Sequence, residues 1–366
     1  MIKFFEQDSN KKIISSLKKY FENDEWIHGK IISQFEKNLK RKININAYPS
    51  TCKSGSDALL LALLLDKKKN RDIYLTSPIS YVATSGIPKF LGLEIIYIDV
   101  EKNSFLLSLD KLESFLDKVK KNIKQRIRGI INVELFGATN DLNRLRKICK
   151  KNNLSLIGDC AQSLGTLFNK KSTLDYYDFS ISSFYPTKIL STYGDGGVVF
   201  LKKKYLKKCF LLKNNGHEKV QKENCKIKAI NSRLDSIHAY ILNEKLNKFN
   251  EILKKRKKNT DLIIKNKPPY LMEVKTNLLV DQNNYILCFL INQNIRKKFL
   301  LFMKNKKIQC KVYYNKLLSD NKVLKPILKT NLNNAESIIN RLICIPNHQN
   351  LSENNLKFII KNLNNF

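Results

Sequence analysis

The hydrophobic and polar positions of this chain alternate between short apolar runs and longer amphipathic ones. Runs rich in β-branched and aromatic residues, such as "DIYLTS" (72–77), "LEIIYIDV" (93–100) and "LSLIGD" (154–159), predict buried strands. The helical patterns at 54–67, before the first of these runs, and at 141–153, before the last, predict helices. Because this alternation is typical of βαβ units, we expect a three-layer α/β domain with a mainly parallel sheet.

The pattern becomes less regular in the second half of the chain. Residues 203–229 form a charged, irregular stretch, and a long helix is predicted over about 231–258. The next segment, 259–275, contains a proline pair that favours extended backbone and predicts a linker. We therefore predict a large domain over 1–258 and a smaller α+β domain over 259–366. Further helices are expected over 83–92, 108–122, 294–305 and from about 352, and further strands over 128–137, 175–184, 196–204, 285–291 and 308–314.

Composition favours a folded cytoplasmic protein. Hydrophobic residues make up 43% of 366 residues, which is enough to build a substantial core. The eight cysteines contain no C-x-x-C pair, and the four histidines show no metal-ligand spacing, so we expect reduced thiols and no zinc site. No apolar run approaches the roughly 20 residues that a membrane span needs.

The charge balance raises the question of a nucleic-acid partner. The net charge is +35, from 67 basic and 32 acidic residues, but only ten of the basic residues are arginine. Proteins that read phosphates or bases favour arginine, and the lysines here are scattered along the chain. We therefore favour a solvated lysine-rich surface that attracts anionic substrates over a nucleic-acid-binding protein, which remains the alternative.

The segment "SGSDALLLAL" places Ser54, Gly55 and Ser56 immediately before or within the first turn of an apolar helix. Free amides and the helix dipole at such a terminus bind phosphate, and glycine allows the anion to approach the backbone. Taken alone, an ordinary N-cap by Ser54 explains the pattern as well.

Two further residues stand where an α/β sheet binds ligands. Asp159 ends the strand "LSLIGD", with Gln162 three positions later, and ligands lie beyond the carboxyl ends of such strands. Lys188 follows Pro186 in "FYPTK", and this proline prevents the preceding strand from continuing, so the lysine is expected in a turn. Taken singly, these residues could be a helix-capping aspartate and one surface lysine among many.

Together the three features match the needs of pyridoxal phosphate. The phosphate needs a helix N-terminus, the ring nitrogen needs an acid that keeps it protonated, and the aldehyde needs a lysine that forms a Schiff base. The order and spacing of the three features agree with that chemistry.

The motifs "SGSDAL", "GDCAQ", "SFYPTKIL", "GDGG" and "NSRLD" also resemble those of one family. The chain is similar to the DegT/StrS family of pyridoxal-phosphate-dependent nucleotide-sugar aminotransferases, from about 26–39 to 345–352. The resemblance implies the fold type I (aspartate-aminotransferase-like) architecture. It also implies transfer of an amino group from L-glutamate to a keto group of a nucleotide-activated hexose, C3 favoured over C4, for surface polysaccharide or glycan synthesis.

The resemblance assigns cofactor contacts to matching positions. Lys188 would carry the cofactor and then move a proton, with pyridoxamine phosphate as the other cofactor form. Asp159 would pair with the ring nitrogen, and Gln162 would contact the phenolic oxygen. Asn231 would reach the phosphate in a neighbouring subunit, which implies a homodimer with shared active sites. The remaining implied cofactor contacts are Gly55, Ser56, Tyr81 and Ser183.

Substrate contacts implied by the resemblance are Glu134, Tyr185, Arg233 and Tyr314. Glu134, in "NVELFG", stands where the family commonly has the histidine of "PVHLYG", so a contact near the sugar would become acidic. A related dehydratase, in which histidine replaces the Schiff-base lysine, is disfavoured by Lys188. A non-catalytic protein of the same fold is a further alternative.

Overall fold

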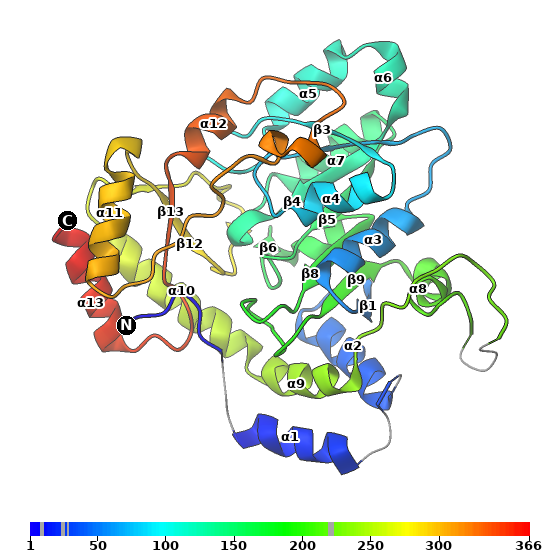
Figure 1. The fold of residues 1–366 in the computed structure, drawn as a ribbon, viewed down its shortest axis with the longest axis horizontal. Helices are drawn as coiled ribbons and strands as arrows, with labels where there is room; N and C mark the ends of the chain where they lie inside the picture. Colours follow the sequence, from blue (N-terminus) through cyan, green and yellow to red (C-terminus); the bar gives the residue numbers. More distant parts are fainter. Residues whose placement is uncertain (8–10, 23–25, 28, 219–222) are drawn as a thin grey trace.

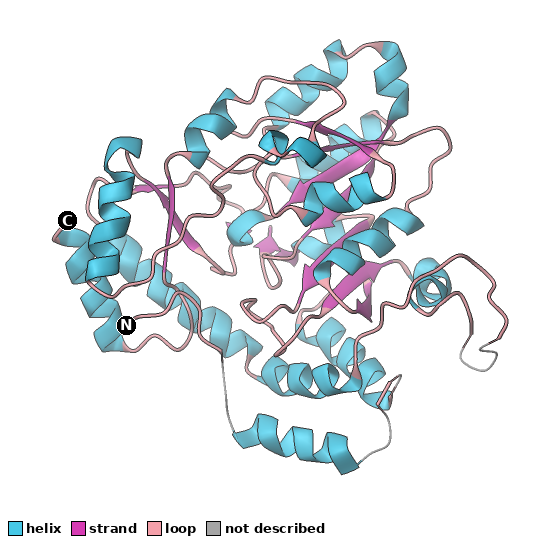
Figure 2. Ribbon diagram, in the orientation of Figure 1, coloured by secondary structure: helices cyan, strands magenta, loops and turns pink. Residues whose placement is uncertain are grey.

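The computed structural model describes residues 1–7, 11–22, 26–27, 29–218 and 223–366. A seven-stranded sheet of order β1-β9-β8-β5-β4-β2-β3 forms its centre (Figures 1 and 2). Neighbouring strands from β3 to β8 pair in parallel, whereas β9 is antiparallel to β8 and β1. The strands are β1 (Tyr48–Cys52), β2 (Ile73–Thr76), β3 (Glu94–Tyr97), β4 (Ile127–Val133), β5 (Ser155–Asp159), β8 (Phe179–Ser183) and β9 (Gly197–Leu201). The mainly parallel sheet is confirmed.

Apolar side chains are buried on both faces of this sheet. In β2, Ile73 and Leu75 join one apolar cluster and Tyr74 joins another, because successive residues of a strand point to opposite faces. Residues of α2, α5, α7 and α9 pack in the first cluster, and residues of α3 and α8 in the second. The predicted three-layer arrangement is therefore confirmed. The helices around the sheet are α1 (Lys11–Glu22), α2 (Lys30–Lys42), α3 (Gly55–Leu65), α4 (Ala83–Phe90), α5 (Leu109–Lys118), α6 (Lys121–Arg126), α7 (Leu142–Lys151), α8 (Leu206–Lys213) and α9 (Ser236–Asn247).

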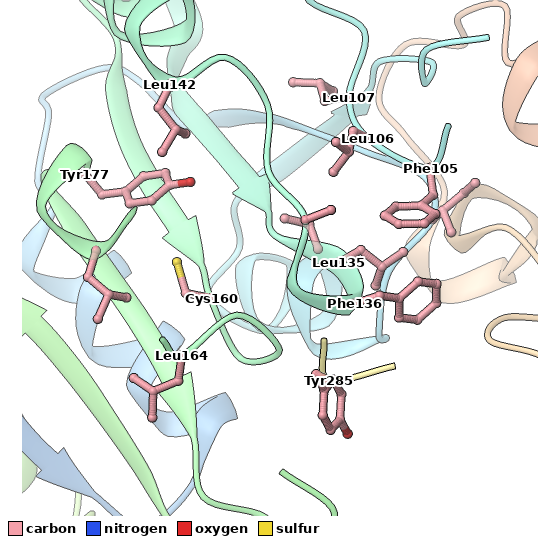
Figure 3. Packing of buried hydrophobic residues seen from close by; sticks show 14 of the residues in the cluster. Phe105, Leu106, Leu107, Leu135, Phe136, Leu142, Cys160, Leu164, Tyr177 and Tyr285 are labelled. Carbon is pink, nitrogen blue, oxygen red and sulfur yellow. The ribbon is translucent and has the colours of Figure 1, made fainter. Parts of the chain in front are cut away.

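The loops beyond the carboxyl ends of β4 and β5 rest on buried side chains. Leu135, Phe136, Cys160 and Leu164 all lie in the first apolar cluster, and Figure 3 shows Leu135 and Phe136 on the side of Tyr285 and Cys160 at the end of a strand. This packing gives the polar groups on the same loops a fixed support.

A second sheet of order β10-β12-β13 lies beside the first (Figure 1). Its apolar cluster contains Phe289 from β12, Phe299 from α11 and Ile359 from α13. The elements of this part are α10 (Phe249–Asn266), β10 (Met272–Glu273), β12 (Leu287–Leu290), α11 (Gln293–Asn305), α12 (Asn333–Ile339), β13 (Leu342–Ile345) and α13 (Glu353–Asn364), and a small third sheet consists of β6 (Leu167–Phe168), β7 (Lys171–Ser172) and β11 (Val280–Asp281). Because α10 runs across the boundary placed at residue 258, that division stays a prediction. Among the described helices, none combines the length and apolar character that crossing a bilayer requires.

Several predicted elements differ from the structure. The single helix predicted over 108–122 is interrupted where Val119 and Lys120 adopt extended backbone, which separates α5 from α6. The irregular stretch contains α8, and the predicted linker begins as the last turns of α10, which ends just before the proline pair. The helix predicted from residue 231 begins only at Ser236, and the strand predicted over 308–314 is reduced to isolated bridges at Ile308 and Lys311.

Candidate active site

Lys188 lies on the turn that follows β8. Its amide donates to the Tyr185 carbonyl at 2.8 Å, and the Thr192 amide donates to the Phe184 carbonyl at 2.8 Å, so backbone hydrogen bonds close the turn. The Lys188 side chain is half-buried, and its Nζ atom lies 5.0 Å from the centroid of the Tyr285 ring.

The surroundings of Lys188 favour a neutral amine. Burial of the ammonium group lowers the pKa of Lys188 to about 8, while the negative charge of Asp159 acts in the opposite direction. An amine attacks a carbonyl only in its unprotonated form. Near neutral pH, Lys188 is therefore neutral in a far larger fraction of molecules than an exposed lysine would be.

Asp159 lies at the carboxyl end of β5 and is buried. Its carboxylate accepts hydrogen bonds from Thr84 Oγ1 at 2.6 Å and from the Ala161 amide at 3.4 Å. Burial raises the pKa of Asp159, whereas these hydrogen bonds and the charge of Lys188 oppose that rise. A cationic ligand atom beside Asp159 would add to the groups that favour the ionised carboxylate.

Gln162 connects three segments of the chain. Its Oε1 atom accepts from the Phe136 amide at 3.0 Å, and its Nε2 atom donates to the Tyr314 hydroxyl at 3.2 Å. Its backbone carbonyl accepts from Asn283 Nδ2 at 3.0 Å. Two of the predicted site residues, Gln162 and Tyr314, are therefore in direct contact. A small cavity beside them is lined by Ala161, Gln162, Leu164, Ser183, Lys188, Ile189, Leu190, Asn283 and Tyr285.

The first turn of α3 lies against the end of β8. Ser54 is the N-cap, and its side chain accepts from the Asp57 amide at 3.0 Å. A Cβ atom on Gly55 would lie 2.8 Å from the Ser183 Cβ, so only glycine allows this close approach. Gly55 and Ser56 belong to the first turn of α3, where backbone amides have no partner within the helix. The structure therefore brings Gly55 and Ser183 together, and Ser56 follows Gly55 in the same helical turn.

The segment that contains Asn231 packs beside the same helix terminus. Ser232 Oγ donates to Asp57 Oδ2 at 2.7 Å, and this contact fixes the segment at the start of α3. Asn231 itself is exposed, and Arg233 donates to Asn214 Oδ1 at 3.1 Å. Tyr81 and Tyr185 are also open to solvent, with exposed fractions of 58% and 51%. The exposed side chains of Asn231, Tyr81 and Tyr185 are open to a ligand or to a second subunit.

Glu134 has surroundings that argue against the predicted sugar contact. The side chain is fully buried, and its carboxylate accepts from the Tyr177 hydroxyl at 2.6 Å, from Thr173 Oγ1 at 2.8 Å and from Ser163 Oγ. Burial raises the pKa of Glu134, and these hydrogen bonds counteract it. All three donors belong to the protein, so Glu134 connects loops rather than facing a ligand.

Sequence reasoning missed three residues that contact the site. Thr84 bonds to Asp159, Asn283 bonds to the Gln162 carbonyl, and the Tyr285 hydroxyl lies 3.1 Å from Thr187 Oγ1. Thr84 could have been found, because it follows the carboxyl end of β2 and ligands bind at that edge of a parallel sheet. Asn283 and Tyr285 come from the far part of the chain, and no local pattern marks them.

A family model described as the DegT/DnrJ/EryC1/StrS aminotransferase family matches residues 7–364. A Pseudomonas aeruginosa protein named UDP-2-acetamido-2-deoxy-3-oxo-D-glucuronate aminotransferase is 28% identical over 68% of this chain and 66% of its own length. A Campylobacter jejuni protein named UDP-4-amino-4,6-dideoxy-N-acetyl-beta-L-altrosamine transaminase is 25% identical over 98% of this chain and 96% of its own length.

Solved structures share the fold over nearly the whole chain. A DegT DnrJ EryC1 StrS aminotransferase from Brucella abortus is 24% identical with a TM-score of 0.90, over 97% of this chain and 95% of that one. An aminotransferase from Helicobacter pylori involved in the biosynthesis of pseudoaminic acid is 21% identical with a TM-score of 0.89, over 100% of this chain and 98% of that one.

Proposed function

This chain belongs to the DegT/DnrJ/EryC1/StrS aminotransferase family, and we propose that it moves an amino group from L-glutamate to a keto group of a nucleotide-activated hexose with pyridoxal phosphate as cofactor. One observation carries the proposal: Lys188, whose pKa is lowered to about 8, lies near enough to the buried carboxylate of Asp159 for the charge of each to act on the other. An amine with a lowered pKa, near a carboxylate, suits a cofactor that has an aldehyde and a basic ring nitrogen.

The residues present fit each end of pyridoxal phosphate. The amides of Gly55 and Ser56 at the N-terminus of α3 would bind the phosphate, and Ser183, which lies against Gly55, would add its hydroxyl. Asp159 would hold the ring nitrogen, and Gln162 would contact the phenolic oxygen. Lys188 would bind the aldehyde.

The side chains then have distinct tasks in the reaction. Pyridoxal phosphate, when bound, supplies an electron sink and carries the amino group between the donor and the sugar. Lys188 Nζ holds and returns the proton that moves during the transfer. The Asp159 carboxylate, kept in place by Thr84, stabilises positive charge beside it. Gln162 orients the ring through a side chain that is itself held by the Phe136 amide.

The substrate proposal rests on charge and on the residues near Gln162. The net charge of +35 attracts both a sugar nucleotide diphosphate and a dicarboxylate donor. Tyr314 contacts Gln162. We propose Tyr314, Tyr185 and Arg233 as substrate contacts. We favour amination at C3 over C4 because of the "GDGG" segment. Glu134, whose carboxylate is buried, is left out of the substrate contacts.

A second copy of the chain would complete the site. Asn231 is exposed next to the α3 terminus, where Ser232 bonds to Asp57. We propose that Asn231 reaches the cofactor phosphate of the other subunit in a homodimer, and that Tyr81 stacks on the cofactor ring. Mixing the variants Lys188→Ala and Asn231→Ala should restore part of the activity that each lacks alone. Two inactive parents that stay inactive after mixing would contradict shared sites.

The cofactor is tested by adding pyridoxal phosphate to the purified protein, recording visible absorbance, and then reducing with borohydride. We expect an absorbance band that reduction fixes on the peptide containing Lys188. Labelling spread over surface lysines, with no preference for Lys188, would refute the assigned attachment site.

The substrate is tested with the loaded protein, L-glutamate, and matched 3-keto and 4-keto sugar nucleotides. The measurement is 2-oxoglutarate release together with the mass of the aminated sugar. We expect faster turnover with the 3-keto sugar. Preference for the 4-keto sugar would reverse the proposed position, and turnover with neither would refute the substrate class.

A further inference from the structure

Besides the groups already described, a side chain from the start of the chain contacts the Lys188 turn. Residues 2–7, here called the N-terminal segment, pack against the part of the chain around residue 309. The Ile2 amide donates to the Lys307 carbonyl at 2.8 Å, and the Phe4 amide donates to Gln309 Oε1 at 3.0 Å. These bonds fix the direction in which the segment leaves toward Lys188.

Gln7, at the end of this segment, bonds to both sides of the turn. Its Nε2 atom donates to the Pro186 carbonyl and, at 3.4 Å, to the Thr192 carbonyl. Pro186 precedes Lys188 by two positions, and Thr192 follows it by four. One NH₂ group therefore connects the backbone before Lys188 to the backbone after it.

The other atom of the same carboxamide faces donors. Gln7 Oε1 accepts from Lys245 Nζ at 2.7 Å and from Ser191 Oγ at 3.4 Å. Lys245 is buried on α9, so this contact connects the turn to the helical layer of the large sheet. The orientation of the carboxamide is defined, because only its nitrogen can face the two carbonyls and only its oxygen can face the two donors.

The N-terminal segment also contacts the ring beneath the lysine. The Phe5 ring stacks on the Tyr285 ring with a centroid separation of 5.7 Å and an interplanar angle of 19°. Tyr285 in turn meets Thr187 through its hydroxyl and lies 5.0 Å from Lys188 Nζ. The N-terminal segment therefore contacts both the backbone of the turn that carries Lys188 and the Tyr285 ring beneath the Lys188 amine.

We propose that Gln7 is a positioning residue for Lys188: its carboxamide holds the turn over 185–193 in the conformation that keeps the Lys188 amine above Tyr285. The inference deepens the proposed function and rests on it, since it assigns a task to Gln7 in preparing the lysine that receives the cofactor. Gln7 is distinct from the groups that would touch the cofactor or the substrate.

Two substitutions separate this role from a merely structural one. Gln7→Ala removes all four contacts. Gln7→Glu keeps the size of the side chain and the contact with Lys245 but places a carboxylate against two carbonyl oxygens. If Gln7 only satisfied Lys245, the glutamate would behave like wild type. Asn334→Ala is the matched control, because Asn334 Nδ2 also donates to a distant carbonyl, that of Val100, at 2.9 Å.

The first readout is amide hydrogen exchange in the cofactor-free protein. The amides of Lys188 and Thr192 are bonded within the turn and report its opening. We expect exchange about tenfold faster at these amides in both Gln7 variants, and unchanged exchange there in Asn334→Ala. Wild-type exchange in both Gln7 variants, or in Gln7→Glu alone, would overturn the proposal. If Gln7→Ala does not fold, the nearly isosteric Gln7→Glu decides.

The second readout is the pH dependence of pyridoxal phosphate capture at Lys188, trapped by borohydride and read by peptide mass. A loosened turn exposes the ammonium to water, so the midpoint should rise by about one pH unit in both variants. An unchanged midpoint would contradict the positioning role. If even wild type captures no cofactor at Lys188, the proposed function fails, whereas the exchange measurement still decides the role of Gln7.

Discussion

Among the lysines with buried surroundings, Lys188 and Lys213 differ in what their ammonium groups meet. Lys213, at the end of α8, donates to the Thr51 carbonyl at 2.6 Å and lies 3.9 Å from Glu36. Among the described residues, Lys188 Nζ has no hydrogen-bond acceptor; it lies over an aromatic ring instead. Burial alone therefore does not mark a reactive lysine. At Lys188, the missing acceptor leaves the charged form poorly compensated.

The largest difference is expected when each of the two lysines is replaced by a neutral residue, because one variant should lose activity and the other stability. Lys188→Ala should abolish cofactor attachment and lower turnover by at least about a thousandfold, with the fold intact. Lys213→Met should keep activity but lower the free energy of unfolding by about 1–3 kcal/mol, because the Thr51 carbonyl loses its donor. Turnover assays and urea denaturation measure the two effects. Retained turnover in Lys188→Ala would show that Lys188 takes no part in the reaction.

A second comparison concerns two aspartates, one of which is Asp159, whose charge acts on Lys188. Asp159→Asn removes the charge beside the proposed ring nitrogen and should lower turnover about a hundredfold. The pKa of Lys188 should fall further, since Asp159 raises it. Asp175→Asn is the control: its carboxylate accepts from the amides of Asn46 and Ala47, so only stability should change. Equal loss of turnover in both variants would contradict a special role for Asp159.

The pH dependence sharpens the contrast further. The pKa of Lys188 in the folded protein, about 8, lies below the value of 10.5 for a free lysine. Between these values the unfolded chain binds more protons than the fold, so this residue's contribution makes the fold more stable as pH rises from 8 to 10.5. Lys188→Met should therefore raise the Tm at pH 7 and remove this part of the pH dependence. A Tm below that of wild type at pH 7 would contradict the assigned burial cost.

The smallest effect on turnover is expected at Glu134. Glu134→Gln should leave the KM for the sugar nucleotide within about twofold and lower the free energy of unfolding by about 1–2 kcal/mol, because the buried carboxylate loses charge-assisted hydrogen bonds. Steady-state kinetics and thermal unfolding separate these outcomes. A tenfold rise in KM with unchanged stability would instead support the contact between Glu134 and the sugar that the sequence predicted.

The parts of the fold that the sequence predicted well are those with local signals. The strands of the large sheet are short apolar runs, and Asp159 ends one of them. The helix α8 was missed because its lysines interrupt the apolar pattern, and the break after Val119 has no glycine or proline to mark it. Local patterns describe neighbours in sequence, whereas such breaks are decided by tertiary packing.

The residues of the candidate site also fall into two groups, those that a local motif marks and those that none marks. Lys188, Asp159 and Gln162 were proposed from motifs, and the structure places them in one region, although their roles stay predictions. Tyr285 and Gln7 carry no motif: each lies about 100 or more positions from Lys188 and meets its turn only after the chain folds. A sequence read without homologues has no physical signal for such contacts.

The pairing of Ile2 with Ile308 has a consequence for the order in which the protein is made. Ile2 is synthesised about 300 residues before Ile308, which at ~5–20 residues per second is a delay on the order of 15–60 s. During that interval Phe4 and Phe5 have no partner at residues 285 or 313 to cover them. The nascent chain therefore exposes an apolar stretch that chaperones can bind, and the ring beneath Lys188 arrives only once residue 285 has been synthesised.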